Sequence, residues 1–320
     1  MQFYDLIVIG GGVSGISAAL EAKKNGIENI LILEKEFELG GMLNQCIDSG
    51  FGLELFNENL TGPEYAQRLI DLAIEMDISY KVDTTVIELK KNKTVIAVNS
   101  SEGLLELMGK SIIISVGCVE RARNAINILG NKFAGVYTIS AAQRLVNMEG
   151  FLPGKEVIII GTGSLALNIA RRMTIEGAKV KAVIEKSDVL TEKMTDMAKC
   201  MADFDIPILF NHQVVDINGQ ERVEGITLVQ IDSNGKPVLG SEKTLACDAI
   251  LLSVTLEPNN KLIKKAEIAR IQGKIYTDIE GVLLCGNADY IHQDTESLLN
   301  DCKLAGDAAS KYILSEKIQN

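Results

Sequence analysis

Long apolar runs are missing from this sequence of 320 residues. Runs such as Leu6 to Ile9, Ile112 to Ile114 and Val157 to Ile160 hold three or four residues, far short of the roughly 20 residues that a membrane-spanning helix needs. No basic residue precedes the first run, and its glycine-rich continuation is unlike a signal cleavage site. These absences predict a soluble, cytoplasmic protein without membrane insertion.

Paired cysteines, histidine and positive charge are also scarce. The six cysteines are scattered without a C-x-x-C spacing, as is typical of reduced, mostly buried thiols in a cytosolic protein. With two histidines and no thiol cluster, no metal site is predicted. A net charge of −11 argues against nucleic acid as a partner, because neutralising phosphates requires a basic face. The residues concerned are Cys46, Cys118, Cys200, Cys247, Cys285, Cys302, His212 and His292.

The remaining composition, 47% hydrophobic and 23% charged, is that of a compact globular chain long enough for two domains. One pattern occurs twice, in Tyr4 to Glu34 and in Glu156 to Glu185. Each copy has a β-rich run, a glycine turn, an alanine-containing helical stretch, a second β-rich run and a final acid. We therefore predict an α/β fold with two Rossmann-like dinucleotide-binding domains.

The first glycine turn, Gly10-x-Gly12-x-x-Gly15, follows a strand and opens a helix. Gly10 permits the tight turn, Gly12 lets the backbone approach a pyrophosphate, and Gly15 lets the helix pack close to the strand. The helix N-terminus offers N–H groups to the phosphates. Glu34 is expected to accept hydrogen bonds from an adenosine ribose. The residues predicted to bind this first nucleotide are Gly10, Gly12, Val13, Ser14, Gly15, Glu34 and Lys35.

The second turn, Gly161-x-Gly163-x-x-Ala166, has alanine in place of the third glycine. Glu185 occupies the ribose position, where a carboxylate favours a free 2′-hydroxyl and repels a 2′-phosphate, so NADH is expected over NADPH. Alanine at this position is loosely associated with NADP sites, and the missing glycine leaves open a domain that no longer binds a nucleotide. The predicted site residues are Gly161, Gly163, Ser164, Ala166 and Glu185.

Further segments organise the two domains. Strands are predicted at Lys110 to Gly117, Asp248 to Val254 and Gly281 to Asn287, and a closing helix from Thr295 to about Ile313. Thr61, with Glu64 three residues later, is the expected N-cap of another helix. The chain is expected to cross between domains near residues 118–124 and 255–260, so that the second domain is an insertion. The predicted domains are 1–120 with 257–320 for the first nucleotide, and 121–256 for the second.

These residues resemble FAD-dependent pyridine nucleotide oxidoreductases of the thioredoxin-reductase type. The matching segments also include Gly40 to Leu43, Leu60 to Pro63, Ser115 to Gly117 and Cys285 to Asn287, which together span nearly the whole chain. The resemblance implies FAD and NAD as cofactors. It further implies that Gly40 and Gly41 lie against FAD and that Gly286 and Asn287 meet its ribityl chain. The residues assigned to FAD on this basis are Gly40, Gly41, Met42, Gly117, Gly286 and Asn287.

A narrower resemblance is to the flavoprotein that accompanies bacterial glycerol-3-phosphate dehydrogenase, and to subunits of amino-acid and opine dehydrogenases. It is carried by Gly40 to Cys46, Ser49 to Gly52, Gly117 to Arg123, Ala142 to Asn147 and Ala170 to Met173. This resemblance implies a partner dehydrogenase or an iron–sulfur electron carrier, and allows a homo-oligomer.

The redox-active cysteines of this fold group are absent. Thioredoxin reductases carry C-x-x-C before the second glycine turn, where this chain has Thr138 to Ala142, and Cys46 has no partner four or five residues away. Cys46 and His292 are candidate catalytic residues. Packing is the more ordinary role for a single buried thiol, and a polar contact at a helix start for His292.

The sequence therefore predicts an FAD-dependent oxidoreductase that moves a hydride between NADH and FAD, and electrons to or from a partner protein, without a redox disulfide. Two alternatives stay open. One is a non-catalytic FAD-binding assembly subunit, and the other is a stand-alone NADH-dependent reductase or oxidase of small molecules.

Overall fold

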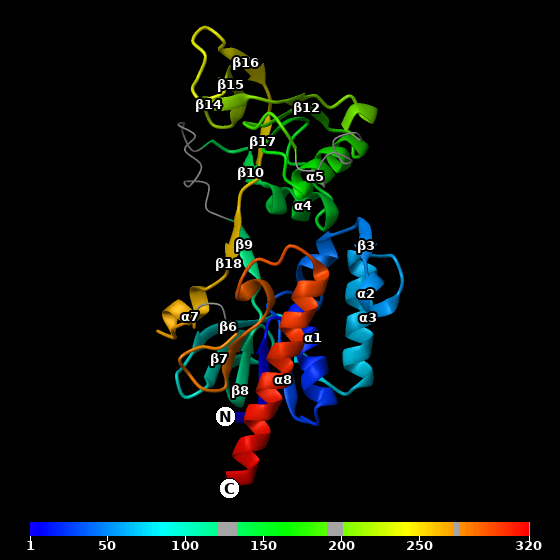
Figure 1. The fold of residues 1–320 in the computed structure, drawn as a ribbon, viewed down its shortest axis with the longest axis vertical. Helices are drawn as coiled ribbons and strands as arrows, with labels where there is room; N and C mark the ends of the chain where they lie inside the picture. The colour runs from blue at the N-terminus through cyan, green and yellow to red at the C-terminus, as the bar shows by residue number, and fades with distance from the viewer. Residues whose placement is uncertain (121–132, 191–200, 272–274, 320) are drawn as a thin grey trace. The chain divides into compact units, whose positions relative to one another are not determined.

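The computed structural model of the chain describes residues 1–120, 133–190, 201–271 and 275–319 (Figure 1). It divides into two compact units, one of Met1–Val119 with Leu256–Asn320 and one of Glu120–Thr255. Cys200 and residues 121–124 of the first predicted crossing lie outside the described residues. The two connections between the units pair as a short sheet of β9 (Cys118–Glu120) and β18 (Leu256–Pro258).

The first unit contains a sheet in the order β5-β2-β1-β8-β7-β6, with β19 also paired to β8. Strand β1 is parallel to β2 and β8, whereas β6 and β7 form an antiparallel hairpin that continues into β8. The strands are β1 (Gln2–Ile9), β2 (Ile30–Leu33), β5 (Ser79–Lys81), β6 (Thr84–Leu89), β7 (Thr94–Asn99), β8 (Gly103–Ile114) and β19 (Val282–Leu284).

Three helices pack together beside this sheet: α1 (Val13–Lys24), α3 (Gly62–Glu75) and α8 (Thr295–Gln319) (Figure 1). Small buried residues let α1 and α8 approach closely, since a Cβ added at Gly306 would lie 2.6 Å from the Ala18 carbonyl oxygen. The smaller elements are η1 (Gly41–Gln45), β3 (Ser49–Phe51), α2 (Leu53–Phe56), β4 (Leu60–Thr61), α7 (Lys261–Lys265) and η3 (Gly286–Ala288).

The second unit repeats the parallel arrangement in the order β10-β17-β11-β12-β13. Helices α4 and α5 pack into one apolar cluster with this sheet, and residues of an antiparallel sheet, β14-β15-β16, pack into another. The elements are β10 (Val136–Thr138), α4 (Ile139–Asn147), β11 (Glu156–Ile160), α5 (Ser164–Ile175), β12 (Lys179–Ile184), β13 (Ile208–Leu209), β14 (His212–Gly219), β15 (Val223–Gln230), β16 (Lys243–Ala246) and β17 (Ala249–Leu252).

The two predicted βαβ units are both present, and Thr61 caps α3 as predicted, with a reciprocal capping box to Glu64. Two elements are longer in the structure than the sequence predicted. Strand β8 begins at Gly103 because its first half pairs with β7, and α8 continues to Gln319 because no glycine or proline follows Ile313.

Candidate nucleotide-binding sites

The first glycine turn is held by contacts within the protein itself. Gly10 has φ of 110°, and a Cβ at Gly15 would lie 1.9 Å from the Gly10 carbonyl oxygen. The Ser115 hydroxyl donates to the carbonyl oxygens of Ile9 and Gly10, at 3.0 and 2.9 Å. Gly10 and Gly15 are therefore required by the fold, whatever the turn binds.

Gly12 differs, because a Cβ added there would clash with no protein atom. A Cβ added there would find its nearest protein atom, the Gly41 Cα, at 3.8 Å. Gly12 is also the N-cap of α1 and provides no side-chain acceptor for the first N–H groups of the helix. An open backbone at a helix N-terminus fits a pyrophosphate.

The loop with Gly40 and Gly41 lies directly against this turn. The Gly40 N–H donates to the Gly11 carbonyl at 2.8 Å, and an isolated parallel bridge joins Gly12 to Gly40. Both loop glycines have positive φ, 112° and 59°. The structure thus brings together two glycine segments that lie apart in the sequence.

Glu34 is buried at the end of β2 and accepts two backbone hydrogen bonds. The Gly11 N–H donates to Oε2 at 2.7 Å, and the Glu36 N–H donates to Oε1 at 2.9 Å. The sequence predicted that Glu34 binds a ribose. It did not predict that Glu34 also holds the glycine turn in place by accepting the Gly11 N–H. Each carboxylate oxygen retains a further lone pair for a ribose hydroxyl.

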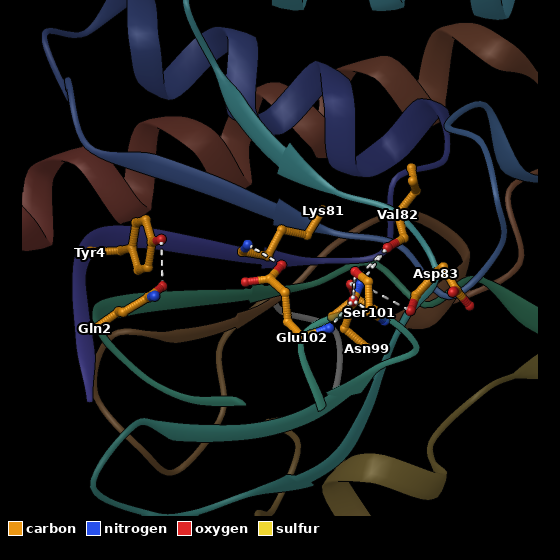
Figure 2. Close-up of polar contacts among 9 residues, drawn as sticks. Gln2, Tyr4, Lys81, Val82, Asp83, Asn99, Ser101 and Glu102 are labelled. Carbon is orange, nitrogen blue, oxygen red and sulfur yellow. Dashed lines mark hydrogen bonds and ion pairs between the residues drawn. The ribbon is translucent and has the colours of Figure 1, made fainter. Parts of the chain in front are cut away.

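The neighbouring strand ends are tied together by Asn99 (Figure 2). Its amide nitrogen donates to the Val82 carbonyl at 3.1 Å and to the Thr84 hydroxyl at 2.9 Å. The Thr84 N–H in turn donates to the Glu34 carbonyl at 2.8 Å. These hydrogen bonds hold the backbone of Glu34 in place.

The C-terminal tail meets the same turn through Gly286, whose φ is 62°. A Cβ at Gly286 would lie 2.1 Å from the Ser14 hydroxyl, and the Gly286 N–H donates to Asp301 Oδ2 at 2.6 Å. Asn287 Oδ1 accepts from the His292 backbone N–H at 3.0 Å and lies 3.1 Å from His292 Nδ1. Sequence reasoning missed Asp301, which lies in α8, 15 residues after the Gly286 that it contacts.

Other predicted FAD-binding residues lie at the edges of this region. Val13 packs against the core of the first unit, and the Lys35 ammonium pairs with Glu36 at 3.0 Å. The Met42 side chain is exposed at the start of η1. Gly117 has φ of 69° with open space where a Cβ would stand, and its carbonyl accepts the Asn259 N–H.

The second turn reproduces the first at the same positions. Thr162 donates its N–H to Glu185 Oε2 at 3.1 Å and its hydroxyl to the same oxygen at 2.6 Å, and the Ser187 N–H donates to Oε1 at 2.9 Å. Gly161 has φ of 96°, and Cβ atoms added at Gly161 or Gly163 would crowd Ser253. Ser164 begins α5, and Ala166 is fully buried within it.

Of the described cysteines, Cys247, Cys285 and Cys302 are buried, and Cys46 and Cys118 are partly buried. Cys46 donates to the Met42 carbonyl and packs against Gly62 at the start of α3. A hydrogen bond from Cys302 and burial together raise the pKa of the Cys285 thiol, and both thiols are fully buried. In the second unit, burial raises the pKa of Cys247 to about 12.

Among the described residues, no cluster of histidine, cysteine, aspartate or glutamate side chains could hold a metal ion. No helix in the same part of the chain is long and apolar enough to span a bilayer.

The profile of the pyridine nucleotide-disulphide oxidoreductase family matches residues 4–287. The chain belongs to this family. A thioredoxin reductase of Ureaplasma parvum is 24% identical over 323 residues, covering 98% of this chain and 97% of that protein. Hydrogen cyanide synthase subunit HcnB of Pseudomonas protegens is 21% identical over 277 residues, 80% of this chain and 57% of that protein.

The fold agrees with this assignment. The crystal structure of Lactococcus lactis thioredoxin reductase has a TM-score of 0.75 and 19% identity, covering 98% of this chain and 99% of that one. The predicted thioredoxin-reductase-like α/β fold is confirmed. So is the prediction of an FAD-dependent oxidoreductase that uses FAD and a nicotinamide nucleotide, as members of this family do.

Proposed function

We propose that this family member transfers a hydride between NADH and FAD and passes electrons to or from a partner protein, without a redox-active disulfide. The observation that carries the proposal is the two matched glycine turns, each with its own buried or half-buried glutamate, in a sequence without a C-x-x-C pair.

In this proposal, FAD is held by the first unit. The open backbone at Gly12 and the adjoining Gly40 and Gly41 accommodate the pyrophosphate, Glu34 accepts from the ribose, and Gly286 with Asn287 meets the ribityl chain. The bound flavin supplies hydride and electron chemistry. The chain's own residues bind and align it, and the fixed Gly10 to Gly15 turn keeps the helix N-terminus aimed at the phosphates.

The second unit is proposed to bind NADH in preference to NADPH. Glu185 is fixed by three hydrogen bonds from Thr162 and Ser187, so its carboxylate cannot easily turn away from a ligand. A 2′-phosphate in the ribose position would meet this negative charge, whereas a 2′-hydroxyl would donate to it.

The proposed absence of a disulfide mechanism is supported by the positions of the cysteines and by their burial. Helix α4 begins after Thr138 with Ile-Ser-Ala-Ala, where thioredoxin reductases carry their cysteine pair. Cys285 and Cys302 contact each other, but burial keeps Cys285 protonated and solvent cannot reach either sulfur. Thiol–disulfide exchange needs an accessible thiolate, so this pair is a poor redox centre.

A partner protein is proposed because the electrons need a second site. The relative HcnB is by name one subunit of hydrogen cyanide synthase, which supports a subunit role here. A dehydrogenase or an iron–sulfur protein fits this role, and the scattered cysteines suit the reducing cytoplasm.

The test is to purify the chain, record its flavin spectrum and add NADH without oxygen. We expect rapid bleaching with NADH, slower bleaching with NADPH, and slow reoxidation by thioredoxin or small disulfides. A flavin-free protein that cannot be reconstituted, or equal reduction by NADPH, would overturn the corresponding part of the proposal.

A further inference from the structure

The tail of the FAD unit contains a buried polar group that the proposed function does not use. The His292 side chain is 2% exposed, and its Nε2 has no hydrogen-bond partner among the described residues. This nitrogen lies 3.9 Å from Oδ2 of Asp301, whose side chain is 6% exposed. Asp301 is the same residue that accepts the Gly286 N–H.

Asn287 determines which nitrogen of His292 carries the proton. Its Oδ1 accepts the His292 backbone N–H, so the oxygen rather than the amide nitrogen must face His292. Nδ1, at 3.1 Å from the same oxygen, must then be a donor. In the neutral ring, Nε2 is left as a bare acceptor that faces the Asp301 carboxylate.

Two acceptors facing each other in a buried site are unfavourable without a proton between them. The pair is well suited to share one, because burial lowers the pKa of His292 and raises the pKa of Asp301. Arg270 pairs with Asp289 at 2.6 Å and also favours the charged form of Asp301, but burial outweighs this attraction and leaves the pKa of Asp301 raised.

The surroundings add few other charges. Asp294 precedes α8 and favours a protonated His292, and the Tyr290 ring lies 4.0 Å from the imidazole between centroids. Burial raises the pKa of Asp289 and of Tyr290, and a hydrogen bond from Cys302 together with burial raises the pKa of the Cys285 thiol near Asp301.

We propose that His292 and Asp301 together hold one exchangeable proton beside Gly286 and Asn287, and that reduction of the bound flavin makes the pair bind this proton more tightly. This inference rests on the proposed binding of FAD at Gly286 and Asn287. A hydride from NADH brings two electrons and one proton to the flavin and leaves NAD⁺, so the cofactor gains one negative charge. The proton that the pair takes up in response comes from solvent.

Histidine NMR tests the proposal on the intact holoprotein. The chain has two histidines, so ¹⁵N-histidine labelling with His212→Gln for assignment isolates the His292 signals. Long-range ¹H–¹⁵N spectra across a pH series should show a neutral ring protonated at Nδ1. The midpoint of the His292 titration should rise when dithionite reduces the flavin.

Two variants separate coupling from general effects on the fold. Asp301→Asn should lower the His292 midpoint by about one pH unit or more, as expected for a carboxylate at this range. Glu296→Gln, which removes an exposed charge from the first turn of the same helix, should shift it much less.

A neutral ring protonated at Nε2, or a midpoint that does not change on flavin reduction, would overturn the inference, and both are read from the unmodified protein. The proposed function would be untouched by either result. It fails on a different observation, a protein that does not bind FAD.

Discussion

Gly12 and Gly15 stand in one turn, but they are glycines for different reasons. A Cβ at Gly15 would collide with the Gly10 carbonyl, whereas a Cβ at Gly12 meets no protein atom closer than 3.8 Å. Gly15→Ala should therefore destabilise the protein by about 1–3 kcal/mol. Gly12→Ala should leave the melting temperature of the FAD-free protein unchanged and raise the FAD dissociation constant roughly tenfold or more.

Thermal unfolding of the apoprotein and fluorescence titration with FAD distinguish these outcomes. A Gly12→Ala protein that binds FAD as tightly as the unmodified chain would show that the pyrophosphate does not lie at this backbone.

Glu185 controls the choice of nucleotide in this account. Replacing Glu185 with arginine removes the acceptor for a 2′-hydroxyl and offers a cation to a 2′-phosphate, so the NADH-to-NADPH preference should fall by about tenfold or more, about 1.4 kcal/mol. The readout is the rate of flavin reduction by each nucleotide under anaerobic conditions. Glu176→Arg, at the exposed C-terminal end of α5, is a matched charge reversal that should leave the preference unchanged.

At the scale of single residues, a local pattern predicted the two glycine turns that the structure contains, and their nucleotide binding stays a prediction. The glycines of both turns and the two glutamates follow from spacing along a βαβ unit. Ser115 and Ser253 contact the two turns from equivalent strands, and their shared position in the repeated strand pattern was the available signal. Asp301 gave no such signal, because its contact with Gly286 depends on how α8 packs.

Helix α3 depends on its capping box. Thr61 Oγ1 accepts the Glu64 N–H, and the Glu64 carboxylate accepts the Thr61 N–H at 2.8 Å. Thr61→Ala should lower the free energy of unfolding of the first unit by about 1 kcal/mol, measured by urea denaturation of the apoprotein. Thr61→Ser, which keeps the hydroxyl, is the control and should lose much less.

The same cap predicts a dependence on pH. The hydrogen bond from the Thr61 backbone lowers the pKa of Glu64 below its usual 4.5. The stabilisation is therefore present above about pH 4.5 and is lost as pH falls toward the lower folded-state pKa. Glu64→Gln should weaken the acid sensitivity of unfolding below pH 4.5. Identical acid profiles for the two proteins would contradict the assignment.

At the scale of elements, sequence patterns predicted the parallel cores and missed the antiparallel additions. The β6–β7 hairpin and the β14–β16 sheet contain partly buried strands with polar residues such as Glu88 in β6 and Asp216 in β14, so they lack a continuous apolar run. Central strands of the parallel cores, such as β2 and β17, are fully buried and read as continuous apolar runs, which is why they were predicted.

At the scale of the whole molecule, the two units carry one internal repeat, seen in the matching backbone hydrogen bonds to Glu34 and Glu185. The family and its cofactors could be predicted because each βαβ unit is formed by neighbouring residues and its pattern occurs twice in the sequence. The partner could not, because a docking surface leaves no fixed spacing in a single sequence. Its identity is accordingly a proposal that rests on the missing thiol pair and on the subunit character of one relative.

The central claim is that electrons pass through FAD without a disulfide, and counting the electrons that the holoprotein accepts tests it most directly. In an anaerobic dithionite titration followed by flavin absorbance, we predict that full reduction requires about one equivalent per FAD, or about two electrons. The number of free thiols, measured after denaturation, should not change on reduction. Uptake of about two equivalents per FAD, with a pair of new thiols, would contradict the account, because a disulfide would then share the electrons.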